Sequence, residues 1–143
     1  MYFPNSGNEF IKDVVESLRK RHKALKHRVN AIACERIIER DDHADHEKIE
    51  ITFRAHVAGR RCGLRVFVWD DRWLWVDCRL AGKRGWLWEW TREGRLRGPA
   101  SGRAIMESLE RTLDLAHTMN AAETARFDDV WIPILARGPR LVH

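Results

Sequence analysis

Covalent chemistry would depend first on the three cysteines, Cys34, Cys62 and Cys78, in a chain that also has seven histidines. Their number is odd and no two form a C-x-x-C pair, so the sequence predicts neither a disulfide framework nor a zinc ribbon. The chain has no G-x-S-x-G elbow and no local cysteine-protease signature. We expect Cys34, on a helix, and Cys78 in the core, and only Cys62, beside Arg60 and Arg61, is a candidate for a lowered thiol pKa. No catalytic residue is predicted.

Metal binding would depend on residues 41–47, DDHADHE, which supply imidazoles and carboxylates. His46 and Glu47 begin like the H-E-x-x-H motif of zinc proteases, but position 50 is Glu50, so the second histidine one helical turn on is missing. The spacing is not diagnostic of a metal site, and a solvated linker between a helix and a strand is the favoured interpretation. We therefore predict no metal site.

Phosphate binding could use the basic run of residues 19–28, RKRHKALKHR, which contains no acidic residue. On a helix, Arg19, Lys20, Lys23 and Lys26 would lie mostly away from the apolar side. Such a row can follow a nucleic-acid backbone with salt-dependent affinity, although most basic runs are solvated surface. Both interpretations stay open at this point.

A second candidate anion site is the segment of residues 94–103, GRLRGPASGR, which leads into a predicted helix. Backbone N–H groups at a helix N-terminus can hold a phosphate or sulfate. The G-K-[ST] ending of a nucleotide-binding P-loop is absent, so nucleotide hydrolysis is not predicted, and an ordinary capped loop is the alternative. The candidate residues are Arg95, Arg97, Ser101, Gly102 and Arg103.

The element that carries the basic run is predicted to be one long helix over residues 7–39. Ser6 and Glu9 have the spacing of a capping box, and apolar residues from Phe10 to Ile37 recur on one half of a helical wheel. An unbroken helix of this length is roughly 45 Å long and would extend past strands of about 20 Å. Either it bends near Asn30, or a partner buries its surplus apolar stripe, which predicts a homodimer.

From Lys48 the apolar period changes to two, which predicts a four-stranded antiparallel meander over residues 48–91. A second helix over residues 101–119 has Ser101 as its expected N-cap. The apolar tail, residues 120–143, is expected to dock on the core or to form an edge strand. The predicted fold is a single α+β domain of residues 1–143, with both helices packed on one face of the sheet.

The other face of this sheet is predicted to be open and to carry arginine and aromatic side chains. Strand alternation assigns to it Thr52, Arg54, His56, Arg65, Phe67, Trp69, Trp73, Trp75, Asp77 and Arg79. The assignment of Trp73 and Trp75 depends on the loop at residues 70–72, because a change of one residue in its length exchanges the faces. The three tryptophans of the last strand, Trp86, Trp88 and Trp90, are predicted to lie in the core.

Two functions fit an aromatic and basic sheet face. Trp and Arg are enriched at the hot spots of protein interfaces, which favours a homodimer or another protein partner. Bases also stack on indole rings while guanidinium groups hold phosphates, so nucleic-acid binding is the alternative. Asp77 in the middle of the face would repel phosphate. The sequence therefore favours a non-enzymatic protein-interaction or self-association module.

Composition excludes several classes of protein. With 143 residues, 33% of them charged, and a net charge of +5, the chain has the proportions of an ordinary globular domain. No apolar run approaches the ~20 residues needed to cross a bilayer, and the N-terminal residues lack an apolar signal region. The odd cysteine count favours a reducing compartment. We expect a cytoplasmic protein with no cofactor and no membrane contact.

Overall fold

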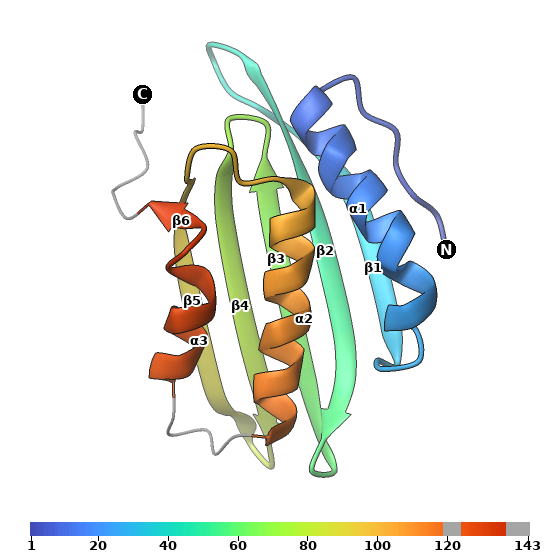
Figure 1. The fold of residues 1–143 in the computed structure, drawn as a ribbon, viewed down its shortest axis with the longest axis vertical. Coiled ribbons are helices and arrows are strands. Elements are labelled where there is room, and N and C mark those ends of the chain that lie inside the picture. The colour runs from blue at the N-terminus through green and yellow to red at the C-terminus, as the bar shows by residue number, and fades with distance from the viewer. Residues whose placement is uncertain (119–123, 137–143) are drawn as a thin grey trace.

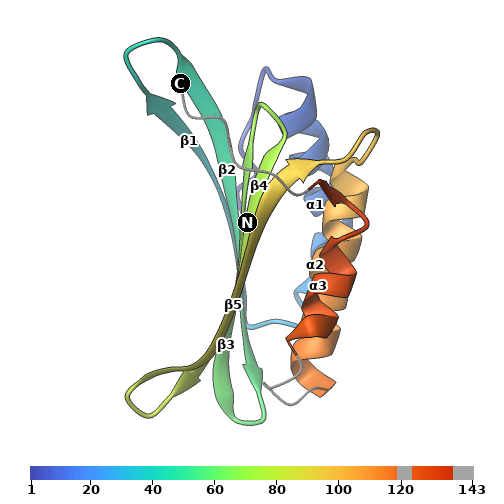
Figure 2. The same cartoon turned by 90° about the vertical axis from the view of Figure 1, so that its left-hand side faces the viewer.

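The computed structural model describes residues 1–118 and 124–136, in which six strands form one antiparallel sheet (Figure 1). The strands follow one another in the sheet in sequence order, and the helices cover one face and leave the other open (Figure 2). The helices are α1 (Glu9–Leu25), α2 (Gly102–Thr118) and α3 (Ala125–Trp131), and the strands are β1 (Ala31–Arg40), β2 (Asp45–Val57), β3 (Arg60–Trp69), β4 (Trp73–Gly82), β5 (Gly85–Leu96) and β6 (Leu135–Ala136). The mixed α+β class and the antiparallel sheet are confirmed.

The core lies between the sheet and the helices. Apolar side chains from alternate strand positions meet one face of each helix, because strand residues two apart and helix residues three or four apart point the same way. The largest fully buried side chains are Trp131, Phe53, Phe127, Ile11, Leu18, Leu25, Ile49, Ile51, Leu64, Leu74, Ile105 and Met106. In the part of the chain described here, no helix is long and apolar enough to span a membrane.

The predicted helix over residues 7–39 is wrong, because α1 ends at Leu25 and residues 31–40 form the edge strand β1. The chain leaves the helix through residues 26–30, and the backbone N–H of Asn30 donates to the carbonyl of Arg54 in β2 over 2.7 Å. The apolar residues Ile32 and Ile37 fit a helical wheel, but β-branched side chains also favour strands, and pairing with β2 decides the outcome. The surplus helical stripe that predicted a homodimer therefore does not exist.

The start of α1 also differs in its cap. The side-chain oxygen of Asn8 accepts the backbone N–H of Ile11 over 2.9 Å, which makes Asn8 the N-cap. The hydroxyl of Ser6, expected to cap the helix, accepts the N–H of Asn8 and donates to the buried carboxylate of Glu47 at the start of β2. Ser6 therefore fastens the N-terminal segment to the sheet.

A four-stranded sheet is also wrong, since the sheet gains β1 at one edge and β6 at the other. The strand β5 runs to Leu96, past its predicted end at residue 91, and Leu96 pairs with Leu135 of β6. At this edge a Cβ on Gly94 would lie 2.6 Å from the carbonyl oxygen of Ala136, so the two backbones approach closely only because residue 94 is glycine. The described part of the tail supplies α3 and β6.

Residues 41–44 form the turn between β1 and β2, where a linker between helix and strand was predicted. The Oδ1 of Asp41 accepts the backbone N–H groups of His43 and Ala44, each over 2.8 Å, and these two bonds lower the pKa of the Asp41 carboxyl. Within residues 1–118 and 124–136, no group of His, Cys, Asp and Glu is placed to hold a metal ion.

A β-bulge in β5 determines where the last tryptophans point. Leu80 pairs with Trp88, but the next residue of β4, Ala81, pairs with Trp86, so one extra residue lies in β5. The extra residue exchanges the faces of the strand. As a result Trp86 is 52% exposed and was wrongly assigned to the core, whereas Trp90 is buried.

Candidate functional site

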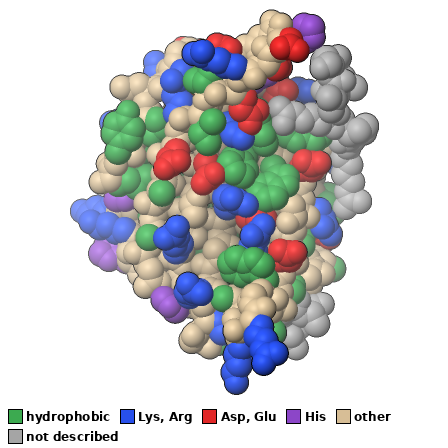
Figure 3. Space-filling view, turned by 180° about the vertical axis from the view of Figure 1, so that it is seen from behind, with side chains coloured by type: hydrophobic (Ala, Val, Ile, Leu, Met, Phe, Trp, Pro, Cys, Tyr) green, Lys and Arg blue, Asp and Glu red, His purple; other side chains and the backbone are tan. Residues whose placement is uncertain are grey.

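The face of the sheet turned away from the helices carries hydrophobic, basic and acidic side chains together (Figure 3). In an antiparallel sheet, residues directly opposite one another point to the same face. By the strand registers, the arginine row consists of Ala31, Arg54, Gly63, Arg79 and Glu89; the middle row of Ala33, Thr52, Arg65, Asp77 and Thr91; and the aromatic row of Glu35, Glu50, Phe67, Trp75 and Glu93. Most of the predicted open-face residues therefore belong to one continuous surface.

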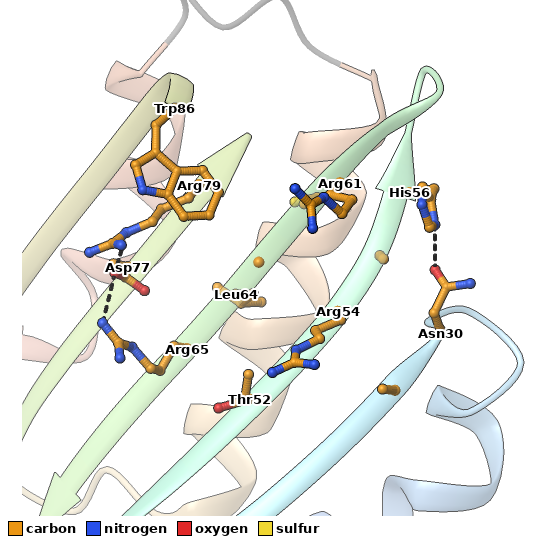
Figure 4. A pocket seen from close by; sticks show the side chains of 14 residues that line it. Asn30, Thr52, Arg54, His56, Arg61, Leu64, Arg65, Asp77, Arg79 and Trp86 are labelled. Atoms are coloured by element: carbon orange, nitrogen blue, oxygen red, sulfur yellow. Dashed lines mark hydrogen bonds and ion pairs between the residues drawn. The ribbon is translucent and has the colours of Figure 1, made fainter. Parts of the chain in front are cut away.

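A hollow of about 610 Å³ lies over the arginine row. Gly63 lies among its lining residues, and a Cβ built on Gly63 would meet no atom within 4 Å, so the missing side chain leaves the space open. Figure 4 shows Arg54 and Arg61 on one side of this space and Arg79 and Trp86 on the other. The hollow is therefore cationic on two sides.

Asp77 is the acidic group of the hollow and is only 2% exposed. Its Oδ2 lies 3.0 Å from Nε of Arg79 and 3.4 Å from Nη2 of Arg65. Burial raises the pKa of the Asp77 carboxyl, and the two guanidinium groups oppose that rise. The guanidinium of Arg79 also lies over the ring of Trp86, 5.2 Å from its centroid, so Asp77 and Trp86 together fix the position of Arg79.

Arg54 and Arg61 differ from Arg65 and Arg79 because neither has an acidic partner among the described residues. Both side chains are exposed and both line the hollow. Their neighbour His56 contacts Asn30, with 3.0 Å between Nδ1 and the amide oxygen. Two guanidinium groups are therefore available for an incoming anion, which planar guanidinium groups can bind through paired hydrogen bonds.

The aromatic row is covered by cations of the same face. The rings of Phe67 and Trp75 lie 5.5 Å apart between centroids, and the guanidinium of Arg65 lies over both. On the other side, the ammonium of Lys48 lies 4.8 Å from the centroid of Phe67 and 5.2 Å from that of Trp69. Phe67 and Trp75 are half-buried, so part of each ring remains available to a partner.

Within the aromatic row, acidic residues lie on both sides of the two rings. Glu50 lies directly opposite Phe67 and Glu93 directly opposite Trp75, while Glu35 continues the row at β1. None of these three carboxylates forms an ion pair within the described part of the chain, although Glu50 accepts the hydroxyl of Thr52 over 3.2 Å. A phosphate beside the rings would therefore meet negative charge.

Trp69 and Trp73 lie at the end of the aromatic region. The loop between them, residues 70–72, has the three-residue length that keeps both tryptophans on one face, and Arg72 in it has a φ of 70°. Trp69 is 8% exposed and donates from Nε1 to Glu39 over 3.3 Å, and Trp73 is 3% exposed. Both were candidate binding residues, but little of either side chain is accessible.

The candidate residues of the basic run lie on α1 and, for Lys26, at its C-cap, in the layer on the opposite side of the sheet from the hollow (Figure 2). Arg19, Lys20, Lys23 and Lys26 are all exposed, and Arg19 lies 3.7 Å from the carboxylate of Glu16. A ligand that contacted both this helix and the arginine row would have to pass around an edge of the sheet. The two candidate surfaces are therefore separate.

The candidate anion site at the start of α2 is filled by the chain itself. The carboxylate of Asp13 in α1 accepts the backbone N–H of Gly102 over 2.7 Å. Arg95 donates to a backbone carbonyl in the β3–β4 loop, Arg97 to the carbonyl of Leu135, and Arg103 pairs with Glu107 one helical turn on. Ser101, the expected N-cap, precedes α2 and is partly buried.

The cysteines are all buried and all have free thiols. Cys34 lies in β1 rather than on a helix, and burial, followed by the charge of Glu35, raises its pKa to about 12. The sulfurs of Cys62 and Cys78 lie 4.0 Å apart. A hydrogen bond with Cys78 lowers the pKa of Cys62, so the shift expected at Cys62 is present but its cause is not the neighbouring arginines.

Sequence reasoning missed Gly63, Arg61 and Trp86 as members of the site. A glycine inside an alternating strand was the available signal for Gly63, because such a residue often marks a close approach or an opening. The bulge that turns Trp86 to the open face has no comparable signal in the sequence. Comparisons with family models, with curated proteins and with solved structures find no match to this chain, so its geometry alone supports a functional assignment.

Proposed function

We propose that this protein is a non-enzymatic interaction module that binds another protein through the open face of its sheet. The observation that carries the proposal is the hollow over Gly63, beside which lie the guanidinium groups of Arg54 and Arg61. Neither group has an acidic partner among the described residues. The half-buried rings of Phe67 and Trp75 lie two rows away on the same face. An anion and an apolar group of one partner can therefore be bound side by side.

The chemistry of this face suits a carboxylate better than a neutral group. A guanidinium and a carboxylate form charge-assisted, often bidentate hydrogen bonds, which are roughly twice as strong as neutral ones. Arg65 and Arg79 are already held by Asp77, so Arg54 and Arg61 would supply these bonds. Aromatic and arginine side chains at the centre of an interface typically contribute most of its binding energy.

The acidic residues support a protein partner over a nucleic acid. Stacked bases would place their phosphates near Glu35, Glu50 and Glu93, which would repel them. The exposed lysines of α1 lie on the other side of the sheet, so a nucleic acid at the hollow would have to pass around a sheet edge to contact them. A protein segment can instead satisfy both signs of charge.

The proposal can be tested with a short glutamate-rich peptide that contains one phenylalanine, titrated at low protein concentration and followed by tryptophan fluorescence. We expect binding that weakens at least about tenfold in Arg54→Glu, which corresponds to about 1.4 kcal/mol. The matched control is Lys20→Glu, an equal charge change on α1, which should leave the peptide affinity unchanged.

A mixed-sequence single-stranded oligonucleotide serves as the competing ligand in the same assay. The proposal is wrong if the oligonucleotide binds and the peptide does not. A nucleic-acid binder should also lose affinity for the oligonucleotide steeply as salt rises, and its binding should be lost in the Lys20→Glu variant. If neither ligand binds, the open face does not take acidic segments, and the proposal also fails.

A further inference from the structure

On the open face, charges that form no ion pair within residues 1–118 and 124–136 lie in different rows according to their sign. Of the unpaired arginines, Arg54 belongs to the arginine row, and Arg61 lies one position further along the strands, opposite His56. The unpaired carboxylates Glu35 and Glu50 belong to the aromatic row. Between them lies the middle row, in which Arg65 and Asp77 neutralise each other.

This arrangement is self-complementary under a two-fold rotation. The two-fold axis lies on the surface of the open face, follows the middle row and so runs perpendicular to the strands. Rotation about it places a second copy face to face with the first, so that each strand lies over its equivalent and runs in the opposite direction. The rotation exchanges the arginine row and the aromatic row, which lie one step, about 7 Å, on either side of the axis. Sheets that pack face to face keep their strands within about 30° of one another, so this register holds best near the centre of the sheet.

We propose that the partner of the open face is a second copy of this chain, packed in this antiparallel arrangement. The inference rests on the proposed function, because it assigns an occupant to the same surface. In β2, Arg54 of one protomer meets Glu50 of its partner, which joins two groups that lack ion pairs within the described residues. By symmetry this contact forms twice.

The shape of the face fits the same register. In β3 the hollow over Gly63 receives the ring of Phe67 from the partner, because the two residues lie in rows that the rotation exchanges. In β4 the guanidinium of Arg79 meets the ring of Trp75, a cation–π pair. The half-buried ring of Phe67 therefore faces the opening that a glycine leaves.

The arrangement brings like charges together on the axis and at one edge. On the axis Arg65 and Asp77 each meet their own equivalent, and within each protomer the two already form an ion pair. In β5, Glu89 of one protomer comes toward Glu93 of the other. Glu89 already has a partner, since its carboxylate lies 3.7 Å from Nε of Arg79. This contact lies toward the side of the face, where the rotation between the sheets separates the strands most.

A second copy supplies a partner for Glu50, which an unrelated acidic segment would not. An acidic peptide in the hollow would pair Arg54 but would leave Glu50 without a cation, whereas in the second copy these two groups meet each other. Glu35 and Glu93 face Ala31 and Glu89 of the second copy and gain no cation in either arrangement. Charge complementarity of this kind selects one partner and one register over others.

The test exchanges the charges of the central pair and measures mass by sedimentation equilibrium. We expect the wild type to dimerise, and Arg54→Glu and Glu50→Arg each to weaken dimerisation at least tenfold, because each places two like charges face to face. An equimolar mixture of the two variants should dimerise again, since both contacts then join a glutamate to an arginine. Circular dichroism of each variant checks that the fold is unchanged, and Lys20→Glu is the matched surface control.

Two outcomes would overturn the inference. The first is a wild type that stays monomeric at protein concentrations up to about 0.1 mM, which would mean a dimer dissociation constant weaker than this concentration. The second is a dimer that both variants leave intact, or that their mixture fails to restore. If the monomer still binds the acidic peptide, the open face is an interaction surface for another protein, and only the self-association is wrong.

Discussion

Asp13 and Gly102 join two helices that are distant in the sequence, because the Asp13 carboxylate accepts the Gly102 backbone N–H over 2.7 Å. A carboxylate at this position satisfies an N–H that has no partner within the helix and lies at the positive end of the α2 dipole. The approach is close, since a Cβ on Gly102 would lie 2.7 Å from both the Asp13 carbonyl oxygen and the Val14 Cα. The glycine therefore determines how tightly α1 and α2 pack.

Gly102→Ala should destabilise the protein by about 1–3 kcal/mol, because the added methyl group must push α1 away from α2. The measurement is urea unfolding followed by circular dichroism. Gly7→Ala is the control, since a Cβ there meets no atom within 4 Å and should change the stability by less than about 0.5 kcal/mol. Equal unfolding midpoints for the two variants would show that the helices do not approach as closely as described.

Thr112→Val should destabilise the protein by about 1–3 kcal/mol, because it removes a buried hydrogen-bond acceptor while keeping the side-chain shape. The indole N–H of Trp131 in α3 donates to the Thr112 hydroxyl over 3.0 Å, and both residues are buried. Thr91→Val on the open face is the matched control and should have little effect. The assay is the same urea titration, and an unchanged Thr112→Val midpoint would exclude this role for the hydroxyl.

The stability difference between wild type and Asp77→Asn should change in favour of wild type as the pH falls. Burial raises the Asp77 pKa, so the folded state holds a proton on this carboxyl more tightly than the unfolded state does. The resulting stabilisation is absent well above the raised pKa and is fully present below the ordinary value of about 4. Urea unfolding at pH values between about 7 and 4 measures it. If the stability difference instead shifts against wild type as the pH falls, the charges of Arg65 and Arg79 have a larger effect on the Asp77 pKa than burial does.

Thiol alkylation should separate the three cysteines in the folded protein. At pH 8 the thiolate fraction of Cys34, with a pKa of about 12, is about one in ten thousand, and the pKa of Cys78 is also raised. Cys62 should therefore react first, and Cys78→Ala should slow it by removing the hydrogen bond that lowers its pKa. Mass spectrometry of iodoacetamide-treated protein follows each site. Faster reaction at Cys34 would contradict these assignments.

The open face could be predicted from the sequence because a strict period of two assigns each residue to one side of a strand. Residues Ile49 to Val57 alternate clearly, and the three-residue loop before Trp73 keeps the parity of the next strand. In β1 the signal is weak, because an edge strand with partly exposed faces need not alternate. Its apolar residues, such as Ile32 and Ile37, therefore also fitted a continued helix.

The hollow could not be predicted for different physical reasons. It results from an absent side chain at Gly63 and from a bulge in β5 that turns Trp86 to the open face. At the anion site predicted before α2, the sequence likewise contains no sign that the carboxylate of Asp13, from another helix, accepts the Gly102 N–H. Such contacts depend on tertiary packing, which local spacing does not report.

The measurement that tests the open face most directly is the affinity of Gly63→Leu for the glutamate-rich peptide. The leucine fills the hollow without meeting another atom at its Cβ, and it replaces glycine in a strand, so the fold should remain stable. We predict that the affinity falls at least about tenfold, while Gly7→Leu, at another open position, binds like wild type. An unchanged affinity in folded Gly63→Leu would show that the hollow is not the binding site.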